Sequence, residues 1–180
     1  MIISFNGDEG SGKSTIAEKV AQELGYPRYY MGQIFRDMAK KKGMTIAEYV
    51  KSGEKDPNVD KEVDDYFLQL AKEQDDFVLE SRTAWHLLPQ SLKIYLKVEE
   101  SEGVKRIHKA LQKDNSRNEI RNLDSIETVL KNIDDTRYKK YYGINIRDMK
   151  KYDFVLDTTK LTREEVFKKT ISFIKKHINS

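Results

Sequence analysis

Residues 7–14, Gly-Asp-Glu-Gly-Ser-Gly-Lys-Ser, decide the fold class of this 180-residue chain. They match the pattern G-x-x-x-x-G-K-[ST] at every fixed position. An apolar run at residues 2–5 precedes them, and apolar residues spaced four apart, Ile16, Val20 and Leu24, follow them. A strand, a glycine-rich turn and a helix in this order direct backbone N–H groups and a helix N-terminus at one anion. The stretch therefore predicts a site for a nucleoside triphosphate.

The side chains of this loop have distinct expected roles. Lys13 is the predicted catalytic cation, because its ammonium group can bridge the β- and γ-phosphates, and the Ser14 hydroxyl suits Mg²⁺. Two carboxylates, Asp8 and Glu9, are unexpected beside phosphate; only the loop backbone must face a ligand, so the direction of these side chains stays open. The predicted ATP-binding set is Gly7, Asp8, Glu9, Gly10, Ser11, Gly12, Lys13, Ser14 and Thr15.

Strand and helix patterns alternate along the rest of the chain. Short apolar strands are predicted at residues 2–5, 28–31, 77–80, 92–98 and 154–156. Helix starts are predicted at Lys13, Thr45, Asp56, Ser101, Asp124 or Ser125, and Thr162. This order predicts a three-layer α/β fold with a five-stranded parallel sheet. We expect one domain over residues 1–180, with a helical acceptor-binding insertion at about 32–75 and a helical lid at about 105–145.

Composition excludes several classes of protein. The chain has no cysteine, which excludes disulfides and thiolate metal sites, and its net charge is +3. It has neither a long apolar run nor an apolar leader, which predicts a cytoplasmic protein with no membrane partner. Residues 103–151 carry thirteen Lys or Arg against seven Asp or Glu, which favours phosphate contact, although a solvated helical face is the alternative. We expect no nucleic-acid partner, and a monomer.

The loop occurs in several classes of nucleotide-binding protein, and the sequence favours one of them. A GTPase needs the guanine motif N-K-x-D, whereas the nearest stretch here, Thr159-Lys160-Leu161-Thr162, lacks the carboxylate. A chain of this size with a basic helical segment before its last strand suits a small-molecule kinase. Such enzymes use several arginines to stabilise the transferring phosphoryl group, and a lid to exclude water.

Four further stretches resemble archaeal-type cytidylate kinases. They are Gly32-Gln-Ile-Phe35-Arg36-Asp-Met-Ala39, the spaced acidic run Asp56-Pro-Asn-Val-Asp60-Lys-Glu-Val-Asp64, Phe77-Val-Leu-Glu80-Ser-Arg82-Thr-Ala-Trp85, and Tyr142-Gly-Ile-Asn145-Ile146. The resemblance spans nearly the whole chain in order. It implies transfer of the ATP γ-phosphoryl group to CMP or dCMP with Mg²⁺, so the expected partners are ATP and a nucleoside monophosphate.

The same resemblance implies an acceptor-binding set. Arg36 and Arg82 would hold the α-phosphate of the acceptor, since a guanidinium group matches phosphate well. Gly32 would permit close approach of the acceptor, next to Phe35 in the same motif. Asp60 would contact the acceptor base or sugar. For Arg36 the alternative is an ion pair with a neighbouring carboxylate.

The resemblance further implies that Arg106 and Arg137 are catalytic lid arginines. Glu80, at the end of a predicted strand, is a candidate to hold a Mg²⁺-bound water; its alternative is a buried, hydrogen-bonded carboxylate. The chain departs from the family pattern at Ser81, Ala110, Leu130 and Asn145. These departures leave two alternatives open: a kinase of the same fold for AMP, UMP or a non-nucleotide acceptor, or a nucleotide-binding protein with degenerate lid chemistry.

Overall fold

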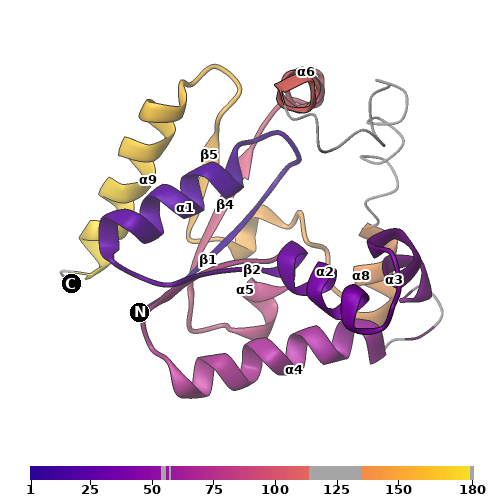
Figure 1. Cartoon of the computed structure of the whole chain (residues 1–180). Helices are drawn as coiled ribbons and strands as arrows, with labels where there is room; N and C mark the ends of the chain where they lie inside the picture. Colours follow the sequence, from indigo (N-terminus) through magenta and orange to yellow (C-terminus); the bar gives the residue numbers. More distant parts are fainter. Residues whose placement is uncertain (54–55, 57, 114–134, 179–180) are drawn as a thin grey trace.

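The computed structural model describes residues 1–53, 56, 58–113 and 135–178, and Figure 1 shows its layers. Five parallel strands form one sheet in the order β2-β3-β1-β4-β5. The strands are β1 (Ile2–Gly7), β2 (Arg28–Tyr30), β3 (Phe77–Glu80), β4 (Leu92–Lys97) and β5 (Phe154–Asp157). The predicted parallel sheet is confirmed. In its register Phe5 of β1 lies opposite Glu80 on one side and Ile94 on the other.

Helices cover both faces of the sheet (Figure 1). On one face α1 (Lys13–Leu24) and α9 (Arg163–Ile178) pack on β1, β3 and β4. On the other face lie α2 (Met31–Lys41), α3 (Ile46–Ser52), α4 (Asn58–Glu73) and the short α5 (Ala84–Leu87). Adjacent strand residues alternate between the two cores, as Ile2 and Ile3 do, because successive side chains of a strand point to opposite faces.

The remaining described elements belong to the connection between β4 and β5. They are α6 (Glu100–Lys113), α8 (Asp135–Tyr142) and the 3₁₀ helix η1 (Met149–Lys151). The stretch expected as an acceptor-binding insertion contains α2, α3 and α4. The helix start expected at Asp124 or Ser125 lies outside the described residues. None of the described helices combines the length and the apolar character that crossing a membrane requires.

Local sequence signals explain where several helices begin and end. Thr162 and Glu165 form a capping box at the start of α9. The Thr162 N–H donates to Glu165 at 2.8 Å, and the Glu165 N–H donates to Thr162 Oγ1 at 3.3 Å. Thr45 and Glu48 make the same reciprocal contacts before α3. Gly25 closes α1 in the left-handed conformation, with φ of 69°. The helix starts predicted at Thr45 and Thr162 are confirmed by these hydrogen bonds.

Candidate nucleotide site

The glycine-rich loop joins β1 to α1 at the carboxyl edge of the sheet. Gly10 and Gly12 have φ of 78° and 86°, the left-handed region that favours glycine. A Cβ atom at Gly10 would lie 2.3 Å from the carbonyl oxygen of Gly103 in α6, so the loop and α6 touch through two glycines. Gly12 is also the residue immediately before α1. Because glycine has no side chain, Gly12 provides no side-chain acceptor for the first N–H groups of that helix.

The Asp8 side chain points away from the loop's interior. Its Oδ1 accepts hydrogen bonds from the Tyr95 hydroxyl at 2.6 Å and from Arg147 at 2.9 Å, and its Oδ2 accepts one from the Val98 N–H at 3.0 Å. These contacts anchor the loop to the end of β4 and to the segment after α8. The sequence leaves the direction of the Asp8 side chain open, and these contacts show that it points toward Tyr95, Val98 and Arg147.

The Glu9 side chain takes the opposite direction and joins two cations. Its Oε1 lies 3.1 Å from Lys13 Nζ and 2.5 Å from a terminal nitrogen of Arg82. Burial alone raises the pKa of Glu9, but Lys13 and Arg82 together lower it to about 2. Glu9 is therefore ionised at neutral pH. The contact brings the cation of the loop and the arginine after β3 to a single oxygen atom.

Ser14 and Glu80 lie together behind the loop. The Ser14 hydroxyl donates to Glu80 Oε1, and Arg28 of β2 donates to Glu80 Oε2 at 2.9 Å. Glu80 is 2% exposed and accepts a hydrogen bond on each carboxylate oxygen, while its predicted role toward Mg²⁺ stays a prediction. A hydroxyl and a carboxylate also supply the oxygen ligands that Mg²⁺ prefers, so these two residues fit the ion chemically.

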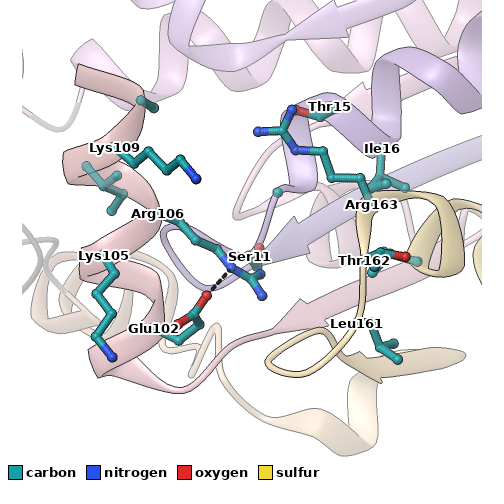
Figure 2. Close-up of a pocket in the computed structure, with 15 residues that line it drawn as sticks. Ser11, Thr15, Ile16, Glu102, Lys105, Arg106, Lys109, Leu161, Thr162 and Arg163 are labelled. Atoms are coloured by element: carbon teal, nitrogen blue, oxygen red, sulfur yellow. Dashed lines mark hydrogen bonds and ion pairs between the residues drawn. The ribbon is translucent and has the colours of Figure 1, made fainter. Parts of the chain in front are cut away.

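A cavity of about 810 Å³ opens beside the loop (Figure 2). Its walls come from the loop and the start of α1, from α6, and from the segment that joins β5 to α9. In Figure 2, Lys109 extends from α6 into the space between these walls. The cationic residues that line the cavity are Lys105, Arg106, Lys109 and Arg163, and Glu102 contributes a carboxylate. A cavity this large, reached from a phosphate-binding loop, is of the size that encloses small ligands.

Arg106 is anchored to the wall of this cavity. Its Nε donates to Glu102 at 2.9 Å, and one terminal nitrogen donates to the carbonyl oxygens of Thr158 and Thr159 at 2.9 and 3.0 Å. Thr158 is fully buried, and its hydroxyl lies within hydrogen-bond distance, 3.2 Å, of the Ser11 carbonyl oxygen. Arg106 thus links α6 to the segment after β5, on the side of the loop where the cavity lies.

The residues predicted to bind the acceptor through the Gly32 motif lie on α2. The Arg36 side chain is exposed; it lies 5.5 Å from the Tyr30 ring centroid, and its Nε donates to Gln33 at 3.3 Å. Phe35 is 8% exposed and packs in the core of this layer. A Cβ atom added at Gly32 would lie 2.6 Å from the Tyr30 ring, so the tip of the Tyr30 side chain would have to move to make room for it.

A pair of buried carboxyl groups lies one turn apart on α4. Asp60 and Asp64 are 5% and 7% exposed, and the Tyr142 hydroxyl at the end of α8 donates to Asp64. Burial raises the pKa of Asp64 to about 6; the Tyr142 hydrogen bond opposes this, and the charge of Asp60 adds to it. The sequence-based prediction places both residues in the acidic run of the resemblance but includes only Asp60 in the acceptor-binding set, and the role of Asp60 stays a prediction.

Comparison of the chain with known proteins identifies its family. The model of the cytidylate kinase-like family matches residues 2–160. The cytidylate kinase of Methanosarcina acetivorans is 37% identical over 166 residues, which cover 89% of this chain and 88% of that protein. The cytidylate kinase of Pyrococcus furiosus is 35% identical over 177 residues, which cover 93% and 84%. This chain belongs to the cytidylate kinase-like family.

Membership of the cytidylate kinase-like family confirms the predicted resemblance and the predicted enzyme class, an ATP-dependent phosphotransferase. Solved structures agree on the fold. An uncharacterized protein from Eubacterium ventriosum superimposes with a TM-score of 0.69 at 18% identity, over 100% of this chain and 99% of that chain. Shikimate kinase from Aquifex aeolicus gives a TM-score of 0.57 at 18% identity, over the same shares.

The departures of this cytidylate kinase-like chain from the family pattern fall at different places. The Ser81 hydroxyl lies 3.2 Å from that of Thr83, and Ala110 lines the cavity. Asn145 accepts a hydrogen bond from the Arg147 N–H at 2.9 Å. Leu130 lies outside the described residues. Arg137 belongs to α8, but its side chain lies outside the described part, so its catalytic role stays a prediction.

Proposed function

We propose that this chain is a nucleoside monophosphate kinase that transfers the γ-phosphoryl group of ATP to CMP or dCMP, giving ADP and CDP or dCDP. One observation carries the proposal: Lys13 of the phosphate loop and Arg82 after β3 lie against the same oxygen of Glu9. Open α/β sheets bind ligands at the carboxyl ends of their strands. A donor phosphate held by Lys13 and an acceptor phosphate held by Arg82 would meet there. The relatives that are named cytidylate kinases support the choice of acceptor.

The reaction requires positioning and charge more than covalent chemistry. An oxygen of the acceptor phosphate attacks the γ-phosphorus, and the bond from that phosphorus to the β,γ-bridging oxygen breaks, so that ADP leaves. No general base is needed, because the acceptor phosphate is already an anion. Lys13 and the N–H groups at the start of α1 stabilise charge on the donor, while Arg82 and Arg36 align the acceptor.

Mg²⁺ fits beside this chemistry as a partner of ATP. Ser14 would bind it directly and Glu80 through water, and the ion would neutralise negative charge on the donor phosphates. Arg28 pairs with the other oxygen of Glu80, so it orients this carboxylate beside Ser14. The cavity between α6 and the segment after β5 would hold the base and sugar of ATP, within reach of Thr15 and Arg106.

The test is a measurement of ADP release from ATP and Mg²⁺ with CMP, dCMP, UMP, AMP, GMP and dTMP as separate acceptors. We expect turnover to be selective for CMP or dCMP. The Lys13→Met variant is the blank, and its loss of turnover should be at least about 100-fold, because a group that stabilises transferred charge is removed. Equal turnover in that variant would contradict the mechanism.

Other outcomes separate the alternatives. Selective turnover with a different nucleotide would move the acceptor assignment and leave the mechanism in place. Binding of ATP without transfer to any of the six nucleotides would contradict the proposed acceptors. That result would favour a non-nucleotide acceptor or a protein that only binds nucleotide.

A further inference from the structure

A single carboxylate oxygen joins the two cations on which the proposed reaction depends. Glu9 Oε1 lies 3.1 Å from Lys13 Nζ and 2.5 Å from Arg82, and the exposed fractions of the three side chains are 29%, 15% and 24%. Lys13 belongs to α1 and Arg82 follows β3, so the contact crosses from the donor side of the sheet edge to the acceptor side. The described side-chain contacts of Glu9 are those with Lys13 and Arg82.

A phosphate oxygen bound by both Lys13 and Arg82 would occupy the position that Glu9 Oε1 now occupies. Ammonium and guanidinium groups bind phosphate oxygens at about 2.7–2.9 Å, and the distances from Glu9 Oε1 to the two cations, 3.1 and 2.5 Å, fall on either side of that range. An incoming phosphate and the Glu9 carboxylate are both anions, so they repel each other at such a separation. A phosphate group that binds Lys13 must therefore displace Glu9 from its place.

Glu9 leaves by moving, not by taking up a proton. Burial raises the pKa of Glu9, but Lys13 and Arg82 outweigh burial and hold that pKa at about 2, so the carboxylate remains charged throughout the neutral range. Its side chain is partly exposed, so rotation toward solvent is open to it. When it rotates away from one cation it also leaves the other, because both contacts use the same oxygen atom.

We propose that Glu9 is a positioning residue that couples the donor and acceptor sites: phosphate that displaces its carboxylate from Lys13 also frees Arg82, and the reverse. Whichever substrate binds first bears the cost of the displacement, and the second binds a site that is already open. Coupling of this kind is reciprocal, so each substrate strengthens the binding of the other by the same factor. The inference rests on the proposed function for the identity of the second ligand.

The test is isothermal titration of the full chain with a non-hydrolysable ATP analogue plus Mg²⁺, with CMP, and with each in the presence of the other. In the wild type we expect each ligand to strengthen the other by about 10-fold, within the usual range of coupling between sites. In Glu9→Gln each ligand alone should bind tighter than in the wild type by that same factor, and the coupling should fall to about 1-fold, because no open state has to be populated first.

Glu9→Ala removes the hydrogen-bonding group as well as the charge and should behave in the same way. Glu18→Gln is the matched control: Glu18 is an exposed carboxylate on α1, and its removal should change neither the affinities nor the coupling. Melting temperatures of all variants establish that they are folded. If Glu9 only stabilised the loop, both Glu9 variants would bind the ligands more weakly, and that result would overturn the proposal.

The two arms of the experiment separate this inference from the proposed function. If CMP fails to bind the wild type, the acceptor assignment fails, and the analogue arm alone decides the role of Glu9. Tighter binding of the analogue to Glu9→Gln then supports displacement, and equal or weaker binding overturns it. If both ligands bind the wild type but the coupling is the same in Glu9→Gln, the proposed function stands and the coupling role of Glu9 is wrong.

Discussion

At the scale of single residues, Asp64 shows how its surroundings alter one carboxyl group. It is buried on α4 near Asp60, and it accepts a hydrogen bond from Tyr142 of α8. Burial raises its pKa to about 6 from the ordinary value of 3.8. The folded protein therefore binds a proton that the unfolded chain has already released over part of the acidic range, and the stability of the fold depends on pH there.

The sign of that dependence gives a prediction. Below about pH 4 Asp64 is protonated in both states; as pH rises from about 4 to 6, only the unfolded chain loses its proton, so the free energy of unfolding falls. Above about pH 6 the loss is complete. We expect the stability of Asp64→Asn, relative to the wild type, to rise by about 1 to 3 kcal/mol between pH 4 and pH 7. Urea denaturation at a series of pH values measures it.

Asp65→Asn provides the comparison, since Asp65 is the exposed neighbour on the same helix. Its stability relative to the wild type should stay within about 0.5 kcal/mol over the same interval. The amide carbonyl that Asp64→Asn introduces can still accept the Tyr142 hydrogen bond, so the substitution removes the charge and leaves the contact. A difference between wild type and Asp64→Asn that does not vary with pH would show that Asp64 titrates normally.

The sequence predicts the glycine-rich turn between β1 and α1 because the spacing of its residues is local. Lys13, Ser14 and Glu80 lie where the motif and the end of a strand place them. The partners that the sequence does not predict are distant in the chain: Glu9 meets Arg82 across 73 positions, and Asp64 meets Tyr142 across 78. Such contacts depend on the strand order and the packing of helices, which no local pattern encodes.

At the scale of elements, caps decide where α9 begins, and α9 in turn forms one wall of the cavity. Thr162 and Glu165 satisfy each other's N–H groups at its first turn, and Thr162 also lines the cavity. Capping signals and apolar periodicity are local, which is why the sequence predicts this helix and all five strands. It does not predict α5, since four residues are too few to show a helical period.

Loss of the cap gives a prediction for this element. Thr162→Ala removes the side-chain acceptor for the Glu165 N–H and should lower the free energy of unfolding by about 1 kcal/mol. Thr162→Ser keeps the hydroxyl and should restore most of that stability. The midpoints of urea denaturation for the three proteins measure the effect. Equal midpoints for Thr162→Ala and the wild type would show that the box does not stabilise α9.

At the scale of the whole molecule, the central position of β1 explains why a short motif organises so much of the chain. The loop leaves β1 between β3, which leads to Glu80 and Arg82, and β4, whose end anchors Asp8. Parallel strands of a sheet bring their carboxyl ends to one edge, so residues far apart in sequence converge there. The sequence predicts a parallel sheet but not its strand order, because strand order depends on how the connections cross the sheet.

The cationic walls of the cavity have a kinetic consequence. Lys105, Arg106, Lys109 and Arg163 line this cavity, so in the proposed function the diffusional encounter of the negatively charged ATP with it would be guided by a long-range field. Added salt shortens the reach of that field. We expect the association rate constant of a fluorescent ATP analogue, measured by stopped flow, to fall by about tenfold between low and high ionic strength.

Two variants of equal net charge locate this effect. Lys109→Gln should reduce both the rate constant and its dependence on salt, while Lys72→Gln, an exposed position on α4 in the opposite helical layer, should leave both unchanged. An identical salt dependence in the two variants would assign the attraction to the total charge of the protein. With the expected result, the cavity wall determines how often a nucleotide arrives as well as where it rests.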